Sequence, residues 1–271
     1  MTEKESLTIL KIGGSVITEK SKGVFNRAKH QEIERIAREI AKVKNTKDED
    51  LNLILIHGAG SFGHPYVERY DLREKKNIEG IIRTHLACKK LNILFCEQLI
   101  RQNLFPYPVH PFSSFRIIDV LEFNLDLFTD AISEGFIPVS HGDMVYNKKR
   151  RFFEVLSGDN IVAELAERLR DKFEIRIGMA TDTDGVVFEG KVLGEIRDSV
   201  LLDSISNSAN LSEMESVKSD VTGGMAGKIK SLERVAEFSE ITIFNGIKEG
   251  NIQSFLKGEN IGTRIKLGEV R

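Results

Sequence analysis

Short apolar runs alternate with amphipathic segments along the first part of the chain. Residues 7–12 and 51–56 are apolar runs too short for a typical helix, and glycines follow closely after each, which predicts two buried strands. Between them, residues 28–43 place apolar side chains at helical spacing among charged ones, which predicts an amphipathic helix. A strand, a helix and a strand in this order imply a right-handed crossover between parallel strands.

The rest of the chain continues with the same kinds of element. Further helices are predicted near 82–101, 119–133, 159–170 and 229–238. Further strands are predicted over 107–110, 136–140, 174–179, 241–244 and 263–267, and hairpins over 144–156 and 186–196. No linker or internal repeat separates the two halves. We therefore expect an α/β protein with one continuous sheet and two lobes, 1–175 and 176–271, with a soft boundary near 172–180.

Composition excludes several classes of protein. The 271 residues carry 39 basic and 41 acidic side chains, so a net charge of −2 gives no sign of a nucleic-acid partner. The two cysteines, Cys88 and Cys96, match neither a zinc motif nor a disulfide framework, which favours a reducing compartment. The sequence contains neither an apolar signal core at the N-terminus nor an apolar run of roughly 20 residues. We therefore expect a soluble, cytoplasmic protein with no membrane partner.

Three glycine-rich turns occur where strands should end. They occupy residues 13–15, 57–64 and 223–228, and two of them are accompanied by lysine. Ligands of open α/β sheets bind beyond the carboxyl ends of the strands, and glycines let backbone N–H groups approach phosphate oxygens. The spacings fit neither a P-loop nor a GxGxxG motif, and the HRD and DFG signatures of protein kinases are absent. The turns therefore favour phosphate binding outside those classes.

Several of these segments together resemble one family. Residues 10–15, 181–186 and 222–225 with Lys228 resemble the amino-acid kinase superfamily. Residues 57–65, with 16–20 and 141–143, are similar to its isopentenyl phosphate kinase branch, although Ala59 stands where many relatives carry glycine. The resemblance implies a three-layer α/β/α sandwich with a central, mainly parallel sheet. It also implies ATP-dependent phosphorylation of isopentenyl phosphate to isopentenyl diphosphate in isoprenoid biosynthesis, with Mg²⁺ as cofactor and a homodimer as assembly.

The resemblance also assigns roles to individual residues. Lys11 would neutralise the transferring phosphate, Lys20 would stabilise the transition state, and His64 would donate to the acceptor phosphate. The residues expected to bind the acceptor are Ala59, His64 and Gly158. The residues expected to bind ATP are Lys11, Gly13, Gly14, Ser15, Gly60, Asp182, Gly223, Gly224 and Lys228. The acidic residues are scattered along the chain, so no metal ligand is assigned.

Several residues could have either a structural or a functional role. His57 and His141 are expected to shape turns, Asp159 could cap a helix instead of serving the site, and Asp184 could belong to a plain turn. The hydrocarbon tail of the acceptor needs an apolar wall. The candidates are Ile82, Leu86 and either Ile93 or Leu94, which could equally be core residues.

Two other functions remain as alternatives. One is a kinase for another small phosphate or phosphonate, such as fosfomycin. The other is a non-catalytic protein of the same fold that binds nucleotides or oxyanions, against which the presence of Lys11, Lys20 and Lys228 together argues.

Overall fold

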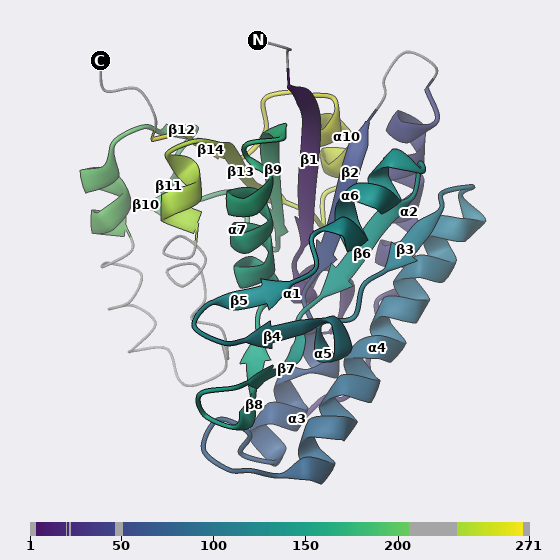
Figure 1. Ribbon diagram of the computed structural model, residues 1–271. Helices are drawn as coiled ribbons and strands as arrows, with labels where there is room; N and C mark the ends of the chain where they lie inside the picture. The colour runs from purple at the N-terminus through teal and green to yellow at the C-terminus, as the bar shows by residue number, and fades with distance from the viewer. Residues whose placement is uncertain (1–3, 20, 22, 47–50, 206–231, 268–271) are drawn as a thin grey trace.

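One eight-stranded sheet runs through the protein in the computed structural model, which describes residues 4–19, 21, 23–46, 51–205 and 232–267 (Figure 1). In spatial order its strands are β12 (Glu195–Ile196), β14 (Thr263–Ile265), β13 (Glu240–Asn245), β9 (Phe173–Thr181), β1 (Glu5–Ile12), β2 (Asn52–His57), β6 (Ile137–His141) and β3 (Pro106–Pro108). Pairing is parallel from β13 through β3, and β14 pairs antiparallel with β13. The predicted parallel crossover between β1 and β2 is confirmed.

Helices cover both faces of this sheet and give three layers (Figure 1). One face packs against α2 (His30–Lys44), α4 (Ile78–Arg101) and α10 (Asn251–Leu256), and the other against α6 (Asp126–Ser133) and α7 (Gly158–Leu169). Alternation along β1 sends Leu10 and Ile12 to the α2 side and Leu7 and Ile9 to the α7 side. By the same alternation Lys11 lies on the α7 side, which decides its partner in the site.

A small four-stranded sheet lies beyond the carboxyl ends of the main strands. Its order is β5 (Leu121–Phe123), β4 (Phe115–Ile117), β7 (Asp143–Asn147) and β8 (Phe152–Leu156). The short helices α3 (His64–Arg69) and α5 (Pro111–Ser114) and the N-terminal part of α4 pack beside it (Figure 1). Their common core contains Val67, Leu72, Ile81 and Met144. Two further short strands, β10 (Val187–Phe188) and β11 (Lys191–Val192), form a separate hairpin.

Most predicted elements are confirmed, with one clear error. The predicted hairpins over 144–156 and 186–196 appear as β7–β8 and β10–β11. The predicted helix over 119–133 is wrong at its start, because residues 121–123 form β5 and α6 begins only at Asp126. Leu121 and Phe123 stand two residues apart and both pack on the α7-side core, which is the spacing of a strand. Asn124 Oδ1 then accepts from Asp126 N, the first residue of α6, whose N-cap is Leu125.

Two expectations bear on the second half of the chain. The predicted helix over 229–238 lies partly outside the described residues, and its described part is helical from 232 to 236. The predicted division between residues 175 and 176 falls within β9, which pairs with β1 on one side and β13 on the other. The main sheet is therefore continuous across that division.

Candidate active site

A single cavity of about 340 Å³ unites nine of the predicted site residues. It lies where β1, β2 and β6 end and continues between α3, α4 and the β7–β8 hairpin. The predicted residues that line it are Lys11, Gly13, Gly14, Ser15, Ala59, Gly60, His64, Gly158 and Asp182. Lys20, Gly223, Gly224 and Lys228 lie outside the described residues. The prediction that ligands bind beyond the strand ends therefore agrees with where the structure places the cavity.

Lys11 is held at the cavity by an acidic partner. Its Nζ lies 2.8 Å from Asp159 Oδ1, and both side chains are almost completely buried. Asp159 is therefore not the helix cap. Ser157 is the N-cap of α7, because its Oγ accepts from Asn160 N at 3.1 Å. The sequence Ser-Gly-Asp-Asn contains this capping signal, so Ser157 could have been identified from the sequence.

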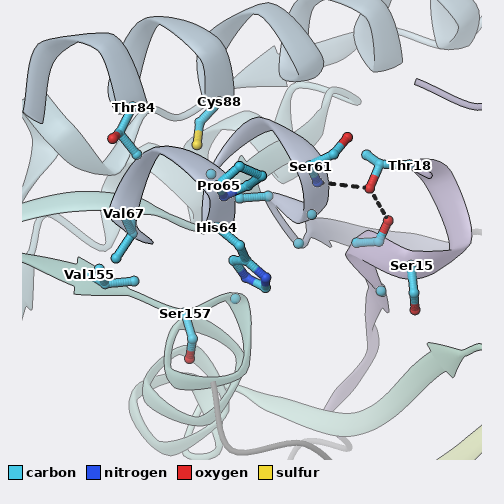
Figure 2. Close-up of a pocket in the computed structure, with 18 of the residues that line it drawn as sticks. Ser15, Thr18, Ser61, His64, Pro65, Val67, Thr84, Cys88, Val155 and Ser157 are labelled. Carbon is cyan, nitrogen blue, oxygen red and sulfur yellow. Dashed lines mark hydrogen bonds between the residues drawn. The ribbon is translucent and has the colours of Figure 1, made fainter. Parts of the chain in front are cut away.

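The first two glycine turns pack directly against each other. A Cβ added to Gly14 would lie 2.6 Å from Gly60 N, and a Cβ added to Gly58 would lie 2.6 Å from Gly14 N. These glycines are therefore required for backbone-to-backbone contact. The Thr18 hydroxyl joins the turns, because it donates to Gly14 O at 2.7 Å and accepts from Ser61 N at 3.0 Å (Figure 2).

Backbone N–H groups from two elements meet beside a third glycine. A Cβ added to Gly142 would lie 3.5 Å from Gly158 N and 3.7 Å from Ala59 N. Gly158 is the first residue of the twelve-residue helix α7, whose N-terminus favours negative charge. Among the described residues, Ala59 N–H donates no hydrogen bond to the protein. These two N–H groups can therefore contribute to an anion site in the cavity, and the sequence assigned no role to Gly142.

His64 enters the cavity from the opposite wall. It is the first residue of α3, directly after Gly63 and before Pro65. Figure 2 shows its ring projecting into the cavity toward the turn that carries Ser157. Lys11, His64 and the N-terminus of α7 thus face one chamber from three different elements.

The residues at the apolar end of the cavity differ from those predicted to form the hydrocarbon wall. Ile82 and Leu86 are 40% and 57% exposed, and Ile93 is also exposed, so these side chains face away from the cavity. Leu94 packs in the α2-side core. The cavity side of α4 instead presents Thr84 and Cys88, which lie two and six residues after Ile82 on another face of the helix (Figure 2).

The apolar chamber is completed by other elements. Val67 of α3, Met144 of β7, and Val155 and Leu156 of β8 line it together with Thr84 and Cys88. Burial raises the pKa of the Cys88 thiol well above its ordinary value, so this side chain is neutral and adds to an apolar surface. Hydrophobic periodicity missed this wall because it combines residues from a helix face, a short helix and a hairpin.

The two aspartates of the 181–186 segment have different surroundings. Asp182 lines the cavity. Asp184 does not line the cavity. Lys248 Nζ lies 2.8 Å from Asp184 Oδ1, and Asn245 Nδ2 donates to the same oxygen at 2.8 Å. These contacts lower the pKa of Asp184. Of the two readings that the sequence allowed for Asp184, the structural one agrees with these contacts.

Within the described residues, no group of three or more His, Cys, Asp or Glu side chains is placed to hold a metal ion. Two of the carboxylates that line the cavity are already engaged, Asp159 by Lys11 and Asp143 by His85, whose Nδ1 lies 2.8 Å from Asp143 Oδ2. The described part of the chain also contains no helix long and apolar enough to cross a membrane.

Comparison with known proteins finds similar chains of nearly the same length. Isopentenyl phosphate kinase of Methanothermobacter thermautotrophicus is 34% identical, over 96% of this chain and 98% of that protein. Isopentenyl phosphate kinase of Methanocaldococcus jannaschii is 33% identical, over 97% of this chain and all of that protein. An X-ray structure of isopentenyl phosphate kinase superposes with a TM-score of 0.75 at 30% identity, over 96% of this chain and 100% of that one.

A second solved structure, of an isopentenyl phosphate kinase substrate complex, superposes with a TM-score of 0.71 at 26% identity, again over 96% of this chain and 100% of that one. The sequence profile described as "Amino acid kinase family" matches residues 6–245, which include every described residue that lines the cavity. The chain therefore belongs to the amino acid kinase family.

Proposed function

We propose that this protein is an isopentenyl phosphate kinase, which transfers the γ-phosphoryl group of ATP to isopentenyl phosphate and produces isopentenyl diphosphate in isoprenoid biosynthesis. The observation that carries the proposal is one cavity with two chemically different ends. Lys11, His64 and the N–H groups beside Gly142 form a polar end, and Thr84, Cys88 and Val67 belong to an apolar end. An acceptor with a phosphate and a short branched hydrocarbon matches this division.

The reaction needs positioning and positive charge rather than a strong base. The second pKa of a phosphate monoester is about 6, so its attacking oxygen is largely ionised near neutral pH. That oxygen forms a bond to the γ-phosphorus while the bond from the γ-phosphorus to the β–γ bridging oxygen breaks, and ADP leaves with the electron pair. Charge on the transferring group is what the protein must stabilise.

We assign each phosphate group of the reaction to described residues according to their position in the cavity. We assign the acceptor phosphate to His64, the Ala59 N–H and the Gly158 N–H, and the transferring group to Lys11. We assign ATP phosphates to the turn of Gly13, Gly14 and Ser15 with Gly60, and the nucleoside to Asp182. Lys20 and Lys228, with Gly223 and Gly224, keep the roles that the family resemblance implies. We also propose 1–175 as the acceptor lobe, which carries the catalytic glycine turns, and 176–271 as the nucleotide-binding lobe.

Mg²⁺ is proposed as the companion of ATP. Mg²⁺ loses its waters reluctantly, so an ion bound together with ATP would need few protein ligands. The engagement of Asp159 and Asp143 with Lys11 and His85 fits an ion held mainly by the nucleotide. When bound, the ion neutralises charge on the phosphate oxygens, and no protein ligand is assigned.

A homodimer is proposed on the exposed side of α4. Ile82, Leu86, Ile93 and Ile100 recur at spacings of four and seven residues, which places them on one face of the helix, and all four are exposed. Exposed aromatic side chains continue this surface toward the edge strand β3: Phe105, Tyr107 and Phe136. Large apolar side chains that are exposed along one helix face are typical of a protein interface. The two prolines of β3 limit main-chain pairing there, so the contact should be made by side chains.

A cytoplasmic location is proposed from the cysteines. Cys88 and Cys96 are both free and buried, which suits a reducing compartment.

The alternatives differ in the acceptor. A kinase for a more polar phosphonate would gain nothing from the buried Val67 and Met144 side chains and the partly buried Val155 side chain around the chamber. A protein that only binds oxyanions would not need a buried lysine fixed beside an aspartate. The family membership and the cavity together favour the isopentenyl phosphate assignment.

The deciding experiment measures ADP release with Mg-ATP and a panel of acceptors. Isopentenyl phosphate should give the highest kcat/KM, above fosfomycin, glycerol 3-phosphate and geranyl phosphate. A different best acceptor would reject the substrate assignment, and ATP binding without turnover of any acceptor would favour the non-catalytic alternative.

A further inference from the structure

Two buried histidines lie directly behind the polar wall of the cavity, where β2 and β6 end. His57 and His141 face each other in the register of these strands, and their rings stack with centroids 5.3 Å apart and planes 17° apart. Both are fully buried, and neither lines the cavity. A glycine follows each of them, and both glycines, Gly58 and Gly142, do line the cavity.

Each ring is bonded to the glycine that follows it. His57 Nδ1 lies 3.1 Å from Gly58 O, and His141 Nδ1 lies 3.0 Å from Gly142 O. A carbonyl oxygen can only accept a hydrogen bond, so both rings carry a proton on Nδ1 and donate it. Two adjacent strands thus end in the same local arrangement, in which a histidine donates a hydrogen bond to the carbonyl of the next residue.

The other nitrogen of each ring is held from a different element. Asn92 of α4 donates through Nδ2 to His57 Nε2 at 3.1 Å. His110 Nδ1 lies 3.0 Å from His141 Nε2 and donates to it. Burial lowers the pKa of His57 to about 4 and that of His141 to about 3, so both rings are neutral near pH 7. The orientation of the His57 ring is therefore fixed at both nitrogens.

The bond to Gly58 fixes a peptide plane that faces the cavity. In a planar trans peptide, the carbonyl and the following N–H point in opposite directions. The peptide between Gly58 and Ala59 turns its carbonyl toward the His57 ring, so the Ala59 N–H points away from that ring. Ala59 lines the cavity, and its nitrogen lies beside Gly142, close to the start of α7.

We propose that His57 is a positioning residue, which holds the Gly58 carbonyl and thereby aims the Ala59 N–H at the acceptor phosphate. His57 touches no reacting atom and acts only through this peptide. His141 supports it by stacking against its ring. The inference rests on the proposed function, because it assigns the Ala59 N–H to the acceptor.

Two substitutions distinguish the roles of the two ring nitrogens of His57. The amide of asparagine reaches the place of Nδ1, so His57→Asn can still donate to Gly58 O while leaving space beside Asn92. The amide of glutamine reaches the place of Nε2, so His57→Gln keeps the contact with Asn92 but loses the bond to Gly58 O. The exposed His30, changed to the same two residues, is the matched control.

The proposal predicts a split between kinetic constants. In His57→Gln, the KM for isopentenyl phosphate should rise about tenfold or more, because a hydrogen bond to a charged group is misaligned. The Kd for ATP, measured without acceptor, should change less than twofold. His57→Asn should keep a KM near that of the wild type even if its thermal midpoint falls. Equal rises in KM for both variants, or a parallel loss of ATP affinity, would show that His57 only supports the fold.

Binding of inorganic phosphate alone, measured by calorimetry, separates this inference from the proposed function. A wild-type protein that does not phosphorylate isopentenyl phosphate rejects the function. The positioning role still predicts that His57→Gln binds phosphate more weakly than wild type and His57→Asn. Equal phosphate affinity in all three proteins would overturn the positioning role whatever the acceptor is.

Discussion

Lys11 Nζ lies 2.8 Å from Asp159 Oδ1, and the two side chains are only 6% and 7% exposed. The pair joins the end of β1 to the start of α7, two elements that are almost 150 residues apart in the chain. It fixes an ammonium group beside the N–H groups at the start of α7, where the reaction needs positive charge. Because an ammonium group has three donors, Lys11 can keep Asp159 and still bind phosphate.

Lys11→Met should lower kcat by about 10²- to 10³-fold, more than it raises the KM for the acceptor, because the lost charge acts mainly in the transition state. Lys20→Met should act in the same direction. Steady-state kinetics with both substrates check this, and Lys4→Met, at an exposed position directly before the same strand, should be close to wild type. A change confined to KM would make Lys11 an ordinary binding residue.

Lys11→Met should also lower the free energy of unfolding by about 3–5 kcal/mol, because it leaves the Asp159 carboxylate buried without its partner. Adding Asp159→Asn to this variant should restore much of the stability but not kcat. Urea denaturation of the single and double variants measures the free energy of unfolding independently of kcat. Restored activity in the double variant would contradict the catalytic role.

His64→Ala should lose most turnover of isopentenyl phosphate while the Kd for ATP stays nearly unchanged. The lost hydrogen bond to a charged oxygen contributes about 1.5–3 kcal/mol, so kcat/KM should fall by about ten- to a hundredfold. His64→Gln should be milder, because an amide can still donate. Wild-type turnover in His64→Ala would reject the assignment, and His30→Ala serves as the control on the exposed start of α2.

Widening the apolar chamber should shift the protein toward longer acceptors. Val67→Ala and Val155→Ala remove methyl groups from its wall, whereas Leu86→Ala changes only the exposed side of α4. A few methylenes accommodated at about 0.8 kcal/mol each should raise the kcat/KM ratio of geranyl to isopentenyl phosphate by roughly tenfold. Leu86→Ala should leave the ratio unchanged. The chamber would not limit chain length if wild type already preferred geranyl phosphate.

Stability should fall as the pH is lowered from 6.5 toward 4. In this window the unfolded chain protonates His57 and His141, whose pKa values in the folded protein are lowered to about 4 and 3. The unfolded state then binds more protons, so each histidine lowers the free energy of unfolding by up to about 1.4 kcal/mol per pH unit.

Urea titrations at several pH values measure this slope. His57→Gln should make it shallower by about the share of one histidine, and His30→Gln should leave it as it is. An unchanged slope in His57→Gln would mean that the ring is charged in the folded protein.

The exposed side of α4 should mediate a dimer. Leu86→Asp with Ile93→Asp should convert a particle of about twice 30.5 kDa into one of 30.5 kDa, as measured by light scattering. Val187→Asp, at an exposed apolar position on β10, is the control and should not change the mass. A wild-type protein that is already monomeric at high concentration would contradict the proposed interface.

The fold could be predicted from the sequence wherever local periodicity carried the signal. The runs at 7–12 and 51–56 became adjacent parallel strands, and the helices near 28–43 and 159–170 became α2 and α7. Short elements escaped because their stability comes from distant partners. The six-residue helix α10 is capped by Glu39 of α2, whose carboxylate accepts from the N–H groups of Gly250, Ile252 and Gln253. No local pattern encodes that contact.

The candidate site divides in the same way. The chemical groups of the site could be recognised in the sequence, because Lys11, the glycine turns and the histidine before Pro65 can be read directly from it. Which of these groups meet depends on the tertiary structure. Alternation along β1 and the position of α7 place Lys11 beside Asp159, and the rotation of α4 turns Leu86 outward and Cys88 inward. A helix pattern shows that a residue is apolar, but the face it occupies in the folded protein depends on packing between elements far apart in the chain.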